Sequence, residues 1–208
     1  MGQCFRVAVC SLIVCVVSSL AVAQELGAGA LKKGATEINL WVGGGSGLGE
    51  SSDFQMLNAG VRLGKVLTGS HGPGFLRGNL EYAADLVPLY LFVQDRVVAP
   101  GATDRQTVYG GSISPLILKW NFTSGKRIAP YIALEESAIF TTDDVPAGDT
   151  STINFASGFG SGLQFFRGDN HALSLSGHLM HISNASIGNH NPSINIALQF
   201  RLGYQWWK

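Results

Sequence analysis

The sequence predicts an all-β fold, an eight-stranded antiparallel transmembrane β-barrel, and three observations support this prediction. Charged residues make up only 13% of the chain and the mean hydropathy is +0.20, yet no long uncharged apolar run follows residue 23. Eight segments alternate between apolar and small or polar side chains, as the strands of membrane-spanning barrels do. Long and short connections alternate between these segments, and no segment has a convincing helical period.

The first residues have the pattern of a secretory signal peptide. A basic start ending at Arg6 precedes an apolar run at 7–17 and the small-residue pattern Ala21-Val22-Ala23. The apolar run is shorter than the ~20 residues that a membrane-spanning helix needs. We therefore predict a signal peptide at residues 1–23 and one β-barrel domain at residues 24–208, exported to the bacterial outer membrane.

Composition excludes several classes of function. Removal of the signal peptide removes all three cysteines, which are Cys4, Cys10 and Cys15. The mature chain then has no disulfide, no zinc-thiolate site and no cysteine nucleophile. The full chain has a formal net charge of zero and no basic stripe, so we expect no nucleic-acid partner. We also expect no cofactor.

Alternation with a period of two defines the eight strands. Their predicted ranges are 36–43, 54–66, 75–91, 107–121, 128–140, 152–166, 172–183 and 193–206. The second, third and eighth strands carry polar groups on the less apolar face: Arg62, Arg77, Asn79, Glu81, Asp85 and Arg201. Side chains fill the lumen of an eight-stranded barrel. We therefore expect these groups to pair with one another and to be structural rather than catalytic.

The sixth strand shows the alternation most clearly. One face carries Ile153, Phe155, Phe159, Leu163 and Phe165. The other face carries Asn154, Gly158, Gly160, Gly162 and Gln164. A soluble sandwich would bury its apolar face, whereas here the polar face carries the glycines that a narrow, crowded lumen requires.

The connections between the strands predict the orientation of the barrel. Long connections are predicted at 44–53, 92–106, 141–151 and 184–192, and short ones near 68–74, 123–127 and 167–171. Outer-membrane barrels have long extracellular loops and short periplasmic turns, so both termini are predicted to be periplasmic. The aromatic residues predicted for a periplasmic girdle are Trp120, Phe122, Tyr204, Trp206 and Trp207. An acidic extracellular loop with Asp143, Asp144 and Asp149 is expected to be solvated, with a divalent-cation site as the alternative.

The seventh strand ends in a segment that could carry chemistry. His181 and Ser183 are two residues apart on a strand and point the same way, which sets an imidazole beside a hydroxyl as nucleophilic catalysis requires. They share the odd-numbered face with Leu173, Leu175 and Leu179. The opposite, lumenal face carries Ser174, Ser176 and His178. The pair is therefore predicted to face lipid at the depth of the outer leaflet, where ionisable groups are costly and usually functional. The alternative is that it belongs to a polar interfacial belt.

The chain from Leu179 to Trp206 resembles the closing part of the outer-membrane lipid A 3-O-deacylases, the acyloxyacyl-hydrolase-like family. The resemblance rests on His-Ile-Ser-Asn-Ala at 181–185 and on Asn-Pro-Ser-Ile-Asn at 191–195, with segment 127–134 as an upstream likeness. It implies an eight-stranded barrel with a lipid-facing site that hydrolyses an ester-linked acyl chain of lipid A. The implied partners are lipid A of lipopolysaccharide and membrane lipids, and a homodimer is left open.

The same resemblance implies roles for single residues. Ser183 would be the nucleophile and His181 the general base. Asn184 would donate to the oxyanion, and the backbone N–H of residue 186 would be the second donor, with Ser186 standing where the family usually has glycine. Asn195 occupies the position of the third triad member, where the family has glutamate.

Two alternatives remain open from the sequence. An Asn-His-Ser triad also resembles that of the outer-membrane phospholipase A family, whose twelve strands need a longer chain. A non-catalytic barrel that stabilises the membrane or binds a ligand is the other. Regular alternation turns Asn195 into the lumen, so a triad role requires a bulge at the start of the eighth strand. Otherwise a neighbouring carboxylate such as Glu136, or none, orients His181.

Overall fold

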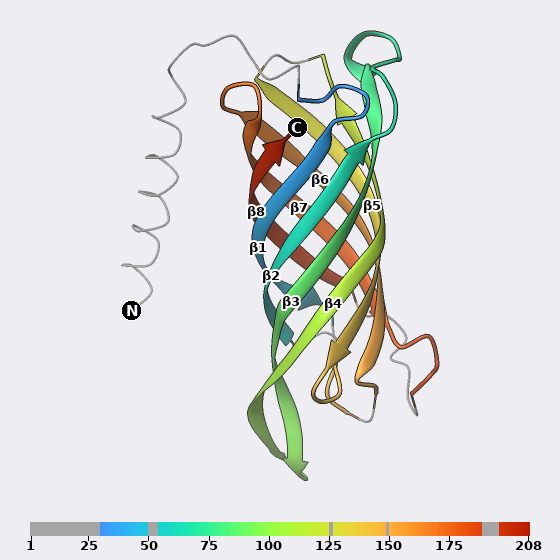
Figure 1. The fold of residues 1–208 in the computed structure, drawn as a ribbon. Coiled ribbons are helices and arrows are strands. Elements are labelled where there is room, and N and C mark those ends of the chain that lie inside the picture. Colours follow the sequence, from blue (N-terminus) through green and yellow to red (C-terminus); the bar gives the residue numbers. More distant parts are fainter. Residues whose placement is uncertain (1–29, 50–53, 125–126, 149, 189–195) are drawn as a thin grey trace.

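A computed structural model describes residues 30–49, 54–124, 127–148, 150–188 and 196–208. Eight antiparallel strands pair in chain order, and β1 pairs with β8 to close the barrel (Figure 1). The strands are β1 (Thr36–Leu48), β2 (Phe54–Val66), β3 (Gly78–Ala99), β4 (Ala102–Phe122), β5 (Ile128–Thr141), β6 (Ile153–Phe166), β7 (His171–Ser183) and β8 (Ile196–Trp207). The predicted fold class is confirmed, whereas the predicted signal peptide lies outside the described residues. No helix in the described part of the chain is long and apolar enough to cross a membrane.

The hairpin of β3 and β4 corrects the predicted loop at 92–106. Both strands continue to a turn at residues 100–101 and project well beyond the barrel, at the end opposite the C-terminus (Figure 1). Opposite charges face each other across the extension, where Asp95 pairs with Arg105 and Arg96 with Asp104. Such cross-strand pairs stabilise a two-stranded ribbon in water. The polar residues that suggested a loop are therefore strand residues outside the apolar belt.

Two strand boundaries also differ from the prediction. β1 continues through the predicted loop as far as Leu48, because its glycines pair on both sides, and a Cβ at Gly45 would collide with the backbone of Leu198. β3 begins at Gly78, after a 3-10 turn, η2 (Gly74–Leu76), rather than at residue 75. Arg77 consequently lies between this turn and β3 and is exposed, so its predicted place in the lumen is wrong.

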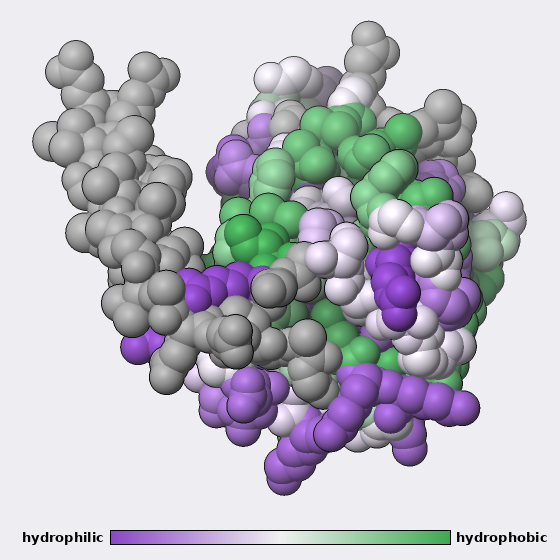
Figure 2. Space-filling view, turned by 90° about the horizontal axis from the view of Figure 1, so that it is seen from above, coloured by the Kyte–Doolittle hydropathy of each residue, from purple (hydrophilic) through white to green (hydrophobic). Residues whose placement is uncertain are grey.

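The outer wall of the barrel is apolar. Exposed side chains on successive strands include Leu40, Leu63, Leu86, Leu118, Leu134, Phe159, Leu175 and Phe200. Figure 2 looks onto the end that carries the C-terminus, where apolar and hydrophilic side chains gather in separate patches. Large apolar side chains pointing away from the lumen on every strand are typical of a wall in contact with lipid.

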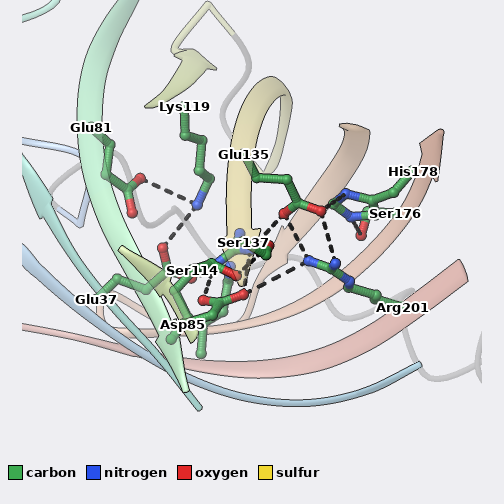
Figure 3. Close-up of polar contacts among 12 residues, drawn as sticks. Glu37, Glu81, Asp85, Ser114, Lys119, Glu135, Ser137, Ser176, His178 and Arg201 are labelled. Atoms are coloured by element: carbon green, nitrogen blue, oxygen red, sulfur yellow. Dashed lines mark hydrogen bonds and ion pairs between the residues drawn. The ribbon is translucent and has the colours of Figure 1, made fainter. Parts of the chain in front are cut away.

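The lumen is filled with paired polar side chains, as predicted. Arg62 donates two hydrogen bonds to Asp85 (2.7 and 2.8 Å), and Arg201 donates two to Glu135 (2.8 and 2.9 Å; Figure 3). Closer to the short turns, the ammonium group of Lys119 lies 2.9 Å from a carboxylate oxygen of Glu37. Buried charge is costly unless it is paired in this way.

Apolar clusters lie in the lumen toward both ends of the barrel. The cluster at the long-loop end includes Trp41, Phe54, Tyr90, Phe92, Ile139 and Ile182. The cluster at the short-turn end includes Leu31, Val66, Phe166, Ala172 and Trp207. Trp207 is therefore a lumenal residue, and its predicted place in an external girdle is wrong because it alternates with Trp206. Tyr204 and Trp206 pack edge to face with ring centroids 4.6 Å apart.

Candidate active site

β7 carries two histidine–serine pairs on opposite faces of the barrel wall. Ser176 and His178 point into the lumen and are buried, whereas His181 points outward beside exposed leucines. Ser183, the last residue of the strand, is half-buried on the same outer face as His181. The predicted assignment of faces on β7 is confirmed.

The inner pair and a neighbouring glutamate have the order of side chains found in a serine hydrolase. The hydroxyl of Ser176 lies 2.9 Å from Nε2 of His178, and Nδ1 of that ring lies 3.3 Å from Oε1 of Glu135 (Figure 3). Both oxygens of Glu135 are, however, already bound by the guanidinium of Arg201. The pair lies in the filled lumen between the two apolar clusters, where a lipid cannot reach the hydroxyl. It is part of the structural network.

The outer pair belongs to a polar row that crosses three strands. His181 lies directly opposite Ser157 on β6, and Ser157 lies directly opposite Glu136 on β5. The hydroxyl of Ser157 donates a hydrogen bond to Oε2 of Glu136 over 2.7 Å. Neighbouring strands are about 4.8 Å apart, so the row from β5 to β7 spans roughly 10 Å. Together with Ser183, these residues form what we call the outer polar island.

Apolar side chains surround the outer polar island. The exposed neighbours along and across the strands are Leu134, Phe155, Phe159, Leu179 and Ile196. A carboxylate and an imidazole on such a wall lose hydration when lipid covers them, and a site of this kind is a functional candidate by default. The island lies toward the long-loop end of the barrel, because His181 and Ser183 are the last outward residues of β7.

The residues after Ser183 form a tight turn. Asn184 is 1% exposed, and its Oδ1 accepts a hydrogen bond from the backbone N–H of Ser186 over 2.9 Å. Ala185 and Ser186 have φ angles of 51° and 62°, in the left-handed region that glycine adopts without cost. The resembled family has glycine at the position of Ser186, and the positive φ angle of this residue is a physical reason for that choice. Strain of this kind is common at functional sites.

The structure brings together some of the predicted site residues and leaves one aside. His181, Ser183, Asn184 and Ser186 lie at the end of β7 and in the turn that follows it, whereas Asn195 lies outside the described residues. Ser157 was missed by the sequence reasoning. Its signal is an interruption of the apolar outer face of β6, just as Glu136 interrupts the apolar outer face of β5.

The acidic loop after β5 binds to the projecting hairpin. The backbone N–H of Asp144 donates to Asp143 Oδ1 (2.8 Å) and lowers the pKa of the Asp143 carboxyl, and a hydrogen bond from the Gln106 amide lowers it further. Arg96 lies 3.4 Å from the same carboxylate. Within the described ranges, no group of three or more His, Cys, Asp or Glu side chains could hold a metal ion. The third acid predicted for this loop, Asp149, lies outside them.

The family described as lipid A 3-O-deacylase (PagL) matches residues 87–205, which is more than half of the chain. The crystal structure of the outer membrane enzyme PagL covers 81% of this chain and 98% of its own, at 18% identity and a TM-score of 0.50. OprG from Pseudomonas aeruginosa covers 86% and 98% at 10% identity and a TM-score of 0.59, and Neisserial surface protein A covers 84% and 99% at 13% and 0.54. At these identities the solved structures show the fold alone. No curated protein matches the chain in sequence.

Proposed function

The chain belongs to the lipid A 3-O-deacylase (PagL) family of the bacterial outer membrane, and from this premise we propose that Ser183 and His181 hydrolyse an ester-linked acyl chain of lipid A. The observation that carries the proposal is the outward direction of this pair. A hydroxyl and an imidazole on the apolar wall meet a lipid ester without the lipid leaving its leaflet. Residues 1–23 are proposed as the export signal.

The proposed reaction has two steps. Ser183 Oγ attacks the carbonyl carbon of the ester while His181 accepts the hydroxyl proton. The tetrahedral intermediate collapses, the bond to the sugar oxygen breaks, and His181 returns the proton to the leaving alkoxide. A water molecule then attacks the acyl-serine, gives one proton to His181 and releases the fatty acid as Ser183 is reprotonated. Neither step requires a cofactor.

The turn after β7 supplies the proposed oxyanion site. Asn184 and the backbone N–H of Ser186 would donate to the developing negative charge, and one such donor contributes about 3 to 4 kcal/mol in known hydrolases. Without substrate the Ser186 amide is bonded to Asn184 Oδ1 and the Asn184 side chain is buried, so both donors have to be released toward the oxyanion. Substrate binding and a change in this turn are therefore coupled in the proposed mechanism.

Asn195 is proposed as the group that fixes the tautomer of His181. An amide oxygen can accept the ring N–H, as the carboxylate does elsewhere in the family. We expect Asn195→Ala to lower the rate of deacylation and Asn195→Glu to retain or raise it. If both variants act on lipid A like the parent, Asn195 is not a member of the triad.

Mass spectrometry of lipid A tests the proposal. Lipid A from cells that express the wild-type chain should lack one ester-linked acyl chain, and cells that express Ser183→Ala should retain it. Ser176→Ala, in the lumen of the same strand, is the matched control and should act like the wild type. An unchanged acylation pattern at good expression of the folded barrel would contradict the proposal and favour a non-catalytic barrel.

The fold bears on the phospholipase alternative and on the homodimer that the sequence left open. The phospholipase resemblance belongs to a family of twelve strands, and closure of this barrel with eight removes its structural support. The homodimer that the sequence leaves open stays a prediction that neither the fold nor the matches support.

A further inference from the structure

Glu136 is a carboxylate that takes no part in the lumenal network. The residue before it, Glu135, points inward and binds Arg201, whereas Glu136 is exposed on the apolar wall. An acidic side chain on a wall in contact with lipid is costly. Its bonding partner is Ser157, which stands directly between it and His181 in the register of the three strands.

We propose that Glu136, acting through Ser157, is a positioning residue that orients His181 for the reaction proposed above. The hydroxyl of Ser157 donates its hydrogen bond to Glu136, so its oxygen keeps lone pairs that can accept the single ring N–H of the opposite imidazole, shared with the amide oxygen of Asn195. Side chains directly opposite each other on paired strands have Cβ atoms about 4.5 to 5.5 Å apart, which is within reach for this bond. The second ring nitrogen then remains available to Ser183.

Charge gives this arrangement a second effect. When His181 accepts the serine proton it becomes an imidazolium, and beside lipid a positive charge is poorly solvated. Asn195, which stands at the family's glutamate position, is neutral and cannot balance that charge. Glu136 carries a negative charge on the outer face, where His181 also lies. The hydroxyl of Ser157 links this carboxylate to the imidazole and so orients the ring. The outer polar island therefore contains, in a different place, the kind of carboxylate that the family position lacks.

Purified full-length chain in detergent micelles that contain lipopolysaccharide allows the kinetic test. We expect Glu136→Gln and Ser157→Ala each to lower kcat about ten- to a hundredfold with little change in KM, since a bridged carboxylate contributes less than the ~10⁴-fold of a directly bonded one. The double variant should be no slower than the slower single one, because both changes remove the same relay. Ser161→Ala, on the outer face of the same strand and four residues away, is the matched control and should keep the parent rate.

A rescue experiment separates positioning from structure. Asn195→Glu introduced into Glu136→Gln should restore most of the lost kcat, because it returns a carboxylate at the family position. Heat-dependent electrophoretic mobility shows that each variant is folded. A parent-like kcat for folded Glu136→Gln, additive losses in the double variant, or no rescue would overturn this inference. Those results leave the proposed function standing when Ser183→Ala is inactive, whereas full activity of Ser183→Ala overturns the proposed function itself.

Discussion

The two histidine–serine pairs of β7 differ in surroundings more than in chemistry. Ser176 bonds to His178 and a glutamate lies 3.3 Å from the other nitrogen of that ring, and yet these side chains lie in a filled lumen with the glutamate bound to arginine. His181 and Ser183 lie only a few residues further along, on the wall that meets lipid. If the outer pair is the active site, as we propose, then hydrogen-bond geometry alone does not identify it. The outer pair differs in its exposure on the apolar wall and in the nearby Glu136, which is bonded to a serine hydroxyl rather than to an arginine.

Replacement of His181, the proposed general base, should have the largest effect on the rate of deacylation. We expect His181→Ala to lower deacylation by about 10⁴-fold or more, as removal of the general base does in serine hydrolases. His178→Ala should retain the catalytic rate and instead lower the stability of the barrel, because Ser176 and Glu135 lose a buried partner. Rates on lipopolysaccharide and urea unfolding of the same samples check both. Loss of activity in folded His178→Ala alone would reverse the assignment of the two pairs.

Glu135 and Glu136 on β5 give a second comparison between the lumen and the outer wall. Glu135→Gln breaks the paired hydrogen bonds with Arg201 and leaves this buried cation with only its longer contact to Asp85, at 3.7 Å, so we expect a loss of up to about 3 to 5 kcal/mol of unfolding free energy. Glu136→Gln should leave the unfolding free energy within about 0.5 kcal/mol of the parent. Unfolding in lipid vesicles, followed by tryptophan fluorescence, measures both. Equal losses would mean that Glu136 also has a structural role.

The faces of β7 can be tested without any enzyme assay. Leu175 is 52% exposed on the outer wall and Ser176 is 6% exposed in the lumen. Leu175→Arg should destabilise the inserted barrel by about 2 to 4 kcal/mol, since it places a cation in the apolar core of the bilayer. Cysteine substitutions at both positions give the control, because only position 175 should react with a lipid-soluble reagent. Reaction at 176 and protection at 175 would show that the register is wrong.

The smallest effect is expected in the acidic loop, where Asp143 binds the projecting hairpin rather than either histidine–serine pair. Hydrogen bonds from Asp144 and Gln106 hold the pKa of Asp143 below its usual value. This carboxylate therefore stabilises the loop against the hairpin at neutral pH, and the stabilisation is lost as the pH falls through the lowered pKa. Limited proteolysis of the loop should become faster on acidification. The loop of Asp143→Asn should be cleaved at the same rate at neutral and at acidic pH. If cleavage of this variant still becomes faster on acidification, the Asp143 carboxylate is not the cause of the pH dependence.

Most of the fold follows from local pattern, and most of the outer polar island does not. Alternation predicted eight strands and the outward face of His181 because successive side chains on a strand point to opposite sides whatever their neighbours are. The row of Glu136, Ser157 and His181 depends on the register between three strands, and single-strand pattern carries no register. The hairpin extension was not predicted for the same reason. Asp95 and Arg105 indicate strand structure only once the register that places them opposite each other is known.

The closed lumen has a consequence for the cell that differs from catalysis. Paired charges and apolar clusters occupy the interior along the described strands, so we expect the barrel to add no conductance to the outer membrane. A porin that is made in larger amounts makes the envelope leakier to small solutes and antibiotics. Here the number of copies can rise without that penalty. Expression level can therefore set the extent of lipid remodelling independently of permeability.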